Sequence, residues 1–210
     1  MIYTSNYDNI DRKEYHEKVI SISGDRGRQK NYIGYCYPAL APKKDFWKIW
    51  HENIGKIPEE ENTKYYIREY YDKVLSGLNC EAVYNKLNEH ILLCYEEPDQ
   101  FCHRQIVASW FELLLGERVP EVVQVGIELK DRTNRDFVKN YLEEVIKERT
   151  DMKGFHSLFA LRLYEKAKKL EANIRTNNDI DVIKILKDFA YDSEAKYVET
   201  NKNKCKKVEI

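Results

Sequence analysis

The stretch His90–Trp110, HILLCYEEPDQFCHRQIVASW, decides both the fold and the site that the sequence predicts. The apolar residues up to Cys94 predict a buried strand, and the acidic, proline-containing segment after them predicts a turn. The amphipathic run that opens with Cys102 predicts a helix. In parallel sheets, ligands bind beyond the carboxyl ends of the strands, and the amides at a helix N-terminus attract anions. We therefore expect a pocket where this strand ends and this helix begins.

The patterns on either side of this stretch predict an α/β core. Strands are expected at Met1–Tyr7, at Val19–Ser23 and, after the helix, at Val119–Ile127. Apolar residues at helical spacing predict further helices at Asp8–His16, Lys44–Asn53, Glu59–Leu75 and Cys80–Leu87. This order favours an α/β fold with a small, mostly parallel sheet and flanking helices.

The sequence changes character after Glu128. Three amphipathic stretches predict helices at Arg135–Arg149, Phe155–Arg175 and Ile180–Tyr191. We therefore predict an α/β core domain at residues 1–128 and an all-helical appendage at residues 129–210. The appendage is expected to be dispensable for folding of the core, and to offer a surface to a protein partner or to a second copy in a homo-oligomer.

Composition and charge narrow the function only slightly. A net charge of −1 with 34% charged residues indicates no overall preference for nucleic acid, and we interpret the 16 tyrosines as ordinary half-buried side chains. No run approaches the ~20 apolar residues of a membrane span, and the N-terminus lacks a signal-peptide pattern. We expect a cytoplasmic protein that binds no membrane. Five scattered cysteines predict reduced thiols rather than a disulfide scaffold.

Cys102, His103 and Arg104 are the strongest candidates for chemistry. A cysteine at a helix N-terminus beside a histidine has the environment that favours a nucleophilic thiolate. His103 is a candidate acid or base, and Arg104 offers a planar guanidinium to a phosphate or carboxylate. Glu96 is a candidate general base, with a solvated loop acid as an equal alternative. The opposite interpretation is that Cys102 packs as a small apolar residue while its two neighbours pair with acids of the loop.

Arg26 and Arg28 lie in a long loop, Gly24–Pro42, that follows a strand. Such a loop suits phosphate recognition, although it has no P-loop or dinucleotide-binding pattern, and a basic loop without a ligand is an equal alternative. Seven residues separate Cys94 from Cys102, which is not a zinc spacing. We expect Cys94 to be a core residue, predict no metal site, and find no pattern that identifies a cofactor.

Several short elements together resemble the domain of unknown function 488 family. They are IYTS at 2–5, SISG with a further glycine at 21–27, YPALAP at 37–42, LLCYE at 92–96 and CHR at 102–104. The matching positions are Thr4, Ser5, Arg26, Arg28, Tyr37, Leu40, Pro42, Cys94, Glu96, Cys102, His103 and Arg104. The resemblance covers roughly the first three-fifths of the chain. It implies a compact α/β protein related to rhodanese-like and cysteine-phosphatase folds, and it places Ser5 and Tyr37 among the candidate substrate-binding residues.

Nine residues lie between Cys94 and Arg104, whereas cysteine phosphatases hold their cysteine and arginine in one tight loop. Two hypotheses therefore stay open. The first is an enzyme of unknown reaction that acts through a Cys-His-Arg centre on a phosphate-bearing substrate, such as a nucleotide or nucleic acid. The second is a binding module that holds the same ligand without turnover. Alkylation should inactivate a thiol enzyme, whereas a binding module should tolerate Cys102→Ser.

Overall fold

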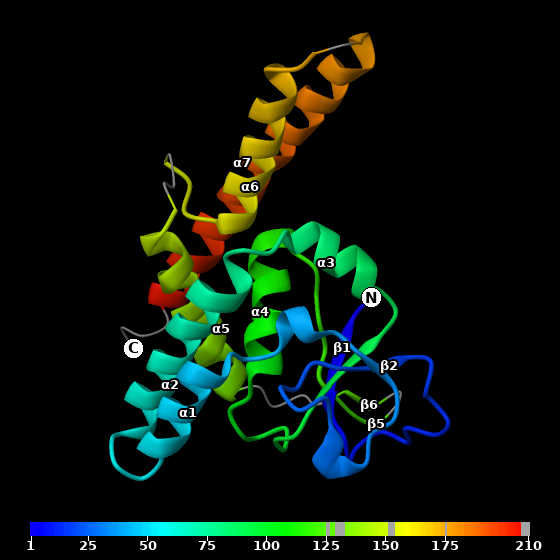
Figure 1. Cartoon of the computed structure of the whole chain (residues 1–210). Helices are drawn as coiled ribbons and strands as arrows, with labels where there is room; N and C mark the ends of the chain where they lie inside the picture. Colours follow the sequence, from blue (N-terminus) through cyan, green and yellow to red (C-terminus); the bar gives the residue numbers. More distant parts are fainter. Residues whose placement is uncertain (125–126, 129–132, 151–153, 175, 207–210) are drawn as a thin grey trace. The chain divides into compact units, whose positions relative to one another are not determined.

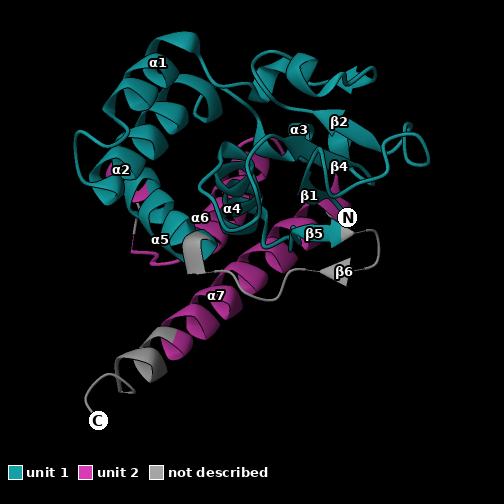
Figure 2. Cartoon of the chain, turned by 90° about the horizontal axis from the view of Figure 1, so that it is seen from below, with its two compact units in different colours: residues 1–146 teal, residues 147–210 magenta. Residues whose placement is uncertain are grey.

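The chain forms two compact units (Figure 2). Unit 1 is residues 1–146 and unit 2 is residues 147–210. The structure is a computed structural model, and it describes residues 1–124, 127–128, 133–150, 154–174 and 176–206.

A four-stranded parallel sheet forms the centre of unit 1. Its strands lie in the order β1-β4-β2-β3, and they are β1 (Tyr3–Asn6), β2 (Val19–Ser21), β3 (Tyr35–Cys36) and β4 (Ile91–Cys94). All four residues of β4 are buried, because this strand is internal to the sheet. Its continuous apolar sequence is typical of a parallel strand covered on both faces. Asn6 pairs in register with Cys94, so β1 and β4 end at the same edge.

Helices flank this sheet. They are α1 (Lys44–Asn53), α2 (Glu59–Tyr70), α3 (Cys80–Leu87), α4 (His103–Leu115) and α5 (Thr133–Glu148), and a π-helical turn, Tyr71–Leu75, continues α2. Helix α4 lies between the sheet and α1 and α2 (Figure 1), and it contacts β1, β4, α2 and α3. It ends at Gly116, whose left-handed backbone (φ 71°) is the usual helix stop. The predicted fold class is confirmed.

Two local predictions are wrong. Residues 8–16 form turns rather than a helix, because the Asp11 carboxylate accepts the amide protons of Lys13 and Glu14 and so competes with helical hydrogen bonds. The strand expected at Val119–Ile127 is a short antiparallel pair, β5 (Val122–Gln124) and β6 (Ile127–Glu128).

The segment before β5 touches the main sheet at one isolated bridge, between Thr4 of β1 and Glu121. Pro120 has no amide proton to give to a ladder. Its carbonyl instead accepts the Thr4 amide, at 2.9 Å. The fourth strand of the sheet is β3, within the loop that the sequence leaves irregular.

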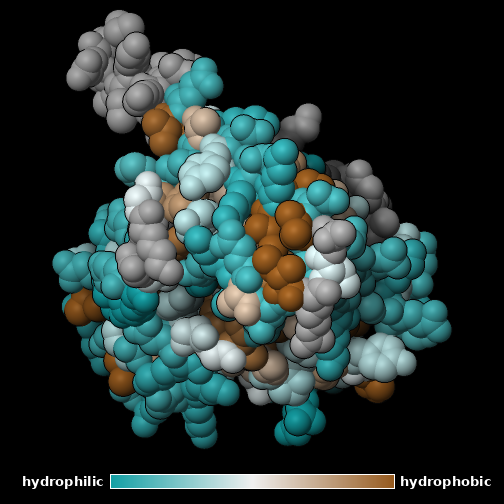
Figure 3. Space-filling view, turned by 90° about the horizontal axis from the view of Figure 1, so that it is seen from above, coloured by the Kyte–Doolittle hydropathy of each residue, from teal (hydrophilic) through white to brown (hydrophobic). Residues whose placement is uncertain are grey.

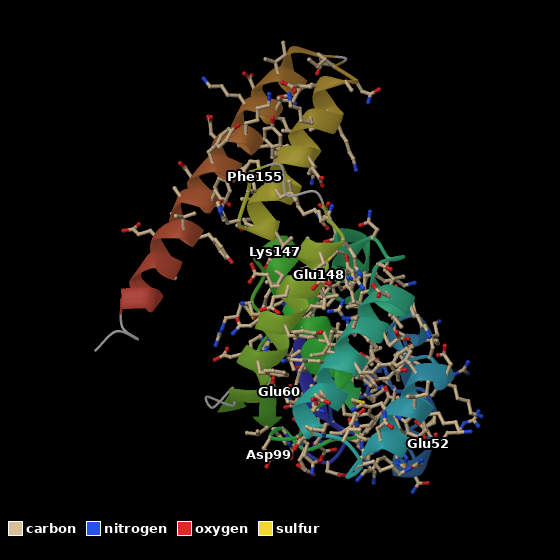
Figure 4. All side chains as sticks on the ribbon, turned by 90° about the vertical axis from the view of Figure 1, so that its left-hand side faces the viewer. Glu52, Glu60, Asp99, Lys147, Glu148 and Phe155 are labelled. Carbon is tan, nitrogen blue, oxygen red and sulfur yellow. The ribbon has the colours of Figure 1, made fainter. Side chains whose placement is uncertain are left out.

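Unit 2 contains two further helices, α6 (Leu158–Glu171) and α7 (Asn177–Lys206), which pack against each other. Phe155, labelled in Figure 4, precedes α6 and lies in a buried cluster with Ala160, Leu161 and Ala190. Helix α7 extends well beyond Tyr191, where the apolar pattern predicts its end. Among the described residues, no helix combines the length and the hydrophobicity that a membrane crossing requires.

Figure 3 shows a mostly hydrophilic surface on which a few apolar side chains gather. In unit 2, the large apolar side chains that are at least half exposed include Ile180, Ile185 and Phe189 of α7. Single exposed apolar groups are normal on a folded protein. A partner or homo-oligomer contact through the C-terminal helices stays a prediction.

The first part of α5 belongs to unit 1, although the sequence places the domain boundary at residue 128. Arg135 and Lys139 pair with Glu112 of α4 at 2.5 and 3.2 Å. Arg68 of α2 donates a hydrogen bond to the Tyr141 hydroxyl at 3.0 Å. Buried apolar side chains complete this face of α5: Val138, Leu142, Val145 and Ile146.

These contacts change what we expect from truncation. A chain that ends after Ile146 is expected to keep unit 1 folded. A chain that ends after Ile127 loses four buried apolar side chains, so its free energy of unfolding should fall by at least about 3 kcal/mol. Urea denaturation followed by circular dichroism measures the free energy of unfolding of both truncated chains. Equal stability of the two truncated chains would favour the boundary at residue 128 instead.

Candidate active site

A cavity of about 570 Å³ lies beyond the carboxyl ends of β2 and β4. This is the edge at which parallel sheets bind ligands, and it is where the strand-loop-helix order predicts a pocket. Three segments that meet there contribute lining residues: Ser23, Gly24 and Asp25 after β2, Cys94, Tyr95 and Glu96 at the end of β4, and Cys102 and His103 at the start of α4.

Aromatic side chains line another part of the cavity. The Trp50 ring lies 5.2 Å from the Tyr66 ring and 6.0 Å from the Phe101 ring, and Trp47 stacks on His51 at 5.1 Å. None of these aromatic residues is among the site residues predicted from the sequence. Aromatic residues at helical spacing look the same in a sequence whether their face lines a cavity or packs in a core.

Cys102 is the N-cap residue of α4, with an extended backbone (φ −150°, ψ 147°). The side-chain carbonyl of Gln105 accepts the Cys102 amide at 3.2 Å, and the Cys102 sulfur in return accepts the Gln105 amide. The Gln105 amide group also donates to the Gln100 carbonyl of the preceding loop at 3.1 Å. This capping box holds the sulfur at the positive end of the helix dipole.

His103 has its two ring nitrogens in different environments. Nε2 lies 3.0 Å from the Ile22 carbonyl oxygen, which can only accept, so Nε2 carries a proton. Nδ1 lies 3.6 Å from Cys94 Sγ and 3.9 Å from Cys102 Sγ. Burial lowers the pKa of His103, but Cys102 and Glu96 outweigh it and raise this pKa above its ordinary value. An imidazolium beside Cys102 is therefore favoured.

The pKa values of the two thiols, Cys94 and Cys102, are shifted in opposite directions. Burial raises the pKa of Cys94 well above its usual range. Burial also disfavours the Cys102 thiolate, but a hydrogen bond from Cys94 and the charges of Arg104 and His103 lower the pKa of Cys102 well below its ordinary value. Cys94 therefore stays a thiol and donates to the Cys102 thiolate.

Glu96 is placed to carry a proton at neutral pH. Burial, followed by the adjacent Cys102, raises the pKa of Glu96 to about 7. The carboxyl group is therefore mostly protonated below that pH and ionised above it. One oxygen interacts with Cys102, while Oε2 is buried and has no partner among the described residues.

Arg104 does not point into the cavity. Its side chain is fully buried, with Nε 2.9 Å from Glu121 Oε1 and Nη2 3.1 Å from the Glu97 carbonyl oxygen. The phosphate-binding role that the sequence suggests for Arg104 is not supported by this position, because Glu121 already holds the guanidinium. Arg104 instead acts on Cys102 through its charge.

The other predicted substrate-binding residues also lie off the cavity lining; these are Ser5, Tyr37, Arg26 and Arg28. Ser5 is buried and donates to the Val122 carbonyl at 2.6 Å, and Tyr37 lies under the Lys86 ammonium. The loop that carries the two exposed arginines reaches the cavity through Asp25, which accepts hydrogen bonds from the Tyr95 hydroxyl and the Gly27 amide.

A family profile, DUF488-N3a, described as the active DUF488-N3 subclade, matches residues 4–114, more than half of the chain. The chain belongs to this family. The DUF488-N3a match extends from β1 almost to the end of α4, so it contains Glu96, Cys102 and His103. No curated protein and no solved structure shows significant similarity to the chain.

Proposed function

We propose that this DUF488-N3a chain is an enzyme that uses the Cys102 thiolate as a nucleophile on a nucleotide-like, phosphate-bearing substrate. The observation that carries the proposal is the convergence of Cys102, His103 and Glu96 on one cavity. A thiolate at a helix N-terminus beside a histidine is the usual form of an activated cysteine nucleophile. The description of the subclade as active supports catalysis.

The side chains have distinct roles in this mechanism. The Cys102 thiolate attacks the electrophilic centre of the substrate and forms a covalent intermediate. Glu96 retains a proton near neutral pH and gives it to the leaving group. His103 stabilises the thiolate, and Glu96, ionised once it has given up its proton, takes a proton from the water that releases the product. Arg104 is a positioning residue, since it touches neither substrate nor the reacting atoms.

The walls of the cavity support a nucleotide-like substrate. Its volume is within the ~300–1,000 Å³ of small-molecule sites. Trp47 and Trp50 offer aromatic faces, on which every nucleobase can stack. Lys44 also lines the cavity and is the first residue of α1, where the helix dipole favours anions. A phosphate at this end and a ring against the aromatic side chains that line the cavity fit this arrangement.

Tryptophan fluorescence tests this substrate class. Nucleoside monophosphates are expected to quench the emission of Trp47 and Trp50, whereas inorganic phosphate alone should not. Because base stacking is worth ~1–3 kcal/mol, Trp47→Ala should weaken binding by roughly 5- to 150-fold. Ile49→Ala is the matched control, because Ile49 is exposed on the same helix and does not line the cavity.

Intact-protein mass spectrometry after incubation with each nucleotide that quenches the tryptophan emission tests the nucleophile. A covalent adduct is expected on Cys102 and should be absent from Cys102→Ser. Binding that Cys102→Ser retains, with no adduct or turnover in either protein, would establish the binding module instead. Absence of quenching by all four common nucleoside monophosphates at millimolar concentration would exclude the substrate class.

A further inference from the structure

The sulfur and nitrogen atoms of Cys94, Cys102 and His103 have the spacing of metal ligands. Tetrahedral zinc, with Zn–S near ~2.3 Å and Zn–N near ~2.05 Å, separates a sulfur from a nitrogen by about 3.5 Å. The Sγ–Nδ1 distances here are 3.6 Å for Cys94 and 3.9 Å for Cys102. All three ligand atoms lie within 4.8 Å of one another. A zinc ion needs only small side-chain shifts to reach all three.

The other ring nitrogen of His103 supports this interpretation independently. Metal-bound histidines almost always donate their second ring N–H to a carbonyl or carboxylate, which fixes the tautomer and the ring orientation. His103 Nε2 lies 3.0 Å from the Ile22 carbonyl oxygen, which leaves Nδ1 as the ring nitrogen that can bind a metal. Cys94 Sγ lies 3.6 Å from Nδ1 and 3.8 Å from Nε2, so the Cys94 side chain must rotate to bind the same ion. The hydrogen bond to Ile22 therefore fixes the tautomer that a metal at Nδ1 requires.

We propose that Cys94, Cys102 and His103 form a zinc site whose fourth position opens to the cavity, and that bound zinc blocks the Cys102 nucleophile. All three residues line the cavity, so an ion can enter and a water can complete the tetrahedron. Zinc ligands must be deprotonated, so Cys94 and His103 Nδ1 release protons to solvent as the ion binds. The Cys102 lone pair that the proposed function uses for attack then forms a bond to zinc.

Cobalt absorption tests the site itself. The chelator-treated full-length chain, titrated with Co²⁺ under reducing conditions, is expected to bind one equivalent and to show a thiolate-to-cobalt charge-transfer band with intense tetrahedral ligand-field bands. Zn²⁺ should remove these bands. They should be lost in Cys94→Ser and His103→Asn, and kept in Cys36→Ser, whose thiol lies outside the cluster. Bands that persist in Cys94→Ser, or no bands in the wild type, would overturn the site.

Alkylation footprinting gives a second measurement on unsubstituted protein, in case a variant fails to fold. One equivalent of Zn²⁺ should protect Cys102 from iodoacetamide and leave the labelling of Cys36 unchanged. Only the inhibitory effect of zinc rests on the proposed function. The zinc site and the thiolate mechanism can therefore be disproved separately. If zinc binds at the cluster and turnover requires it, the inhibitory role and the thiolate mechanism are wrong although the site is real. If zinc does not protect Cys102, the site is wrong and the thiolate mechanism is untouched.

Discussion

Cys102 in metal-free protein at pH 6 is expected to react with iodoacetamide on the order of tenfold faster than a free model thiol, and Cys102→Ser to abolish this reaction. An ordinary thiol is only ~0.3% ionised at pH 6, whereas the lowered pKa of Cys102 gives this thiol a larger ionised fraction. The expected advantage is smaller than the ratio of ionised fractions, because nucleophilicity falls as thiol pKa falls. Mass spectrometry of peptides labelled across a pH series measures the rate.

The lowered pKa of Cys102 also determines how its alkylation rate, relative to that of an ordinary thiol, changes with pH. The advantage of Cys102 should be present at low pH and disappear as the pH rises through ~8.5, where an ordinary thiol also ionises. Cys36→Ser, on the half-buried residue of β3, is the matched control and should keep the fast reaction. If Cys102 reacts no faster than the model thiol at pH 6, Cys102 is not an activated nucleophile and the binding module is favoured.

Glu121→Gln is expected to lower the free energy of unfolding by about 3–5 kcal/mol, because it leaves the Arg104 charge buried without its ionic partner. Both side chains are almost completely buried, and Glu121 also accepts a hydrogen bond from the Thr4 hydroxyl at 2.6 Å. The same substitution therefore weakens the attachment of the segment before β5 to β1. Urea denaturation of unit 1, followed by tryptophan fluorescence, measures the loss.

An exposed ion pair provides the control for this prediction. Lys48 and Glu52 are four residues apart on α1, and both side chains are more than half exposed. Such pairs contribute little, so Glu52→Gln should leave stability nearly unchanged. Equal effects of Glu52→Gln and Glu121→Gln would contradict the view that the buried pair holds this part of unit 1 together.

The location of the site follows from local sequence patterns. A continuous apolar run that ends in Cys94 indicates a buried strand, and helical spacing after Cys102 indicates a helix. The hydrogen bonds of the strand nevertheless come from β1 and β2, which are distant in sequence. The predictions for α1 and α3 are also confirmed to the residue. Residues 8–16 were misassigned because the Asp11 side chain competes for backbone amides, which apolar spacing does not reveal.

Local sequence patterns are sufficient to place Cys94, Cys102, His103 and Arg104 in one strand-loop-helix element. Which of these residues face the cavity depends on tertiary packing. Neighbouring side chains on a helix diverge by ~100°, so His103 turns toward the two sulfurs while Arg104 turns toward Glu121, which is distant in sequence. The aromatic walls come from α1 and α2, and the two thiols approach one imidazole only when β4 and α4 pack together. Such contacts depend on long-range packing, and spacing along the chain does not encode them directly.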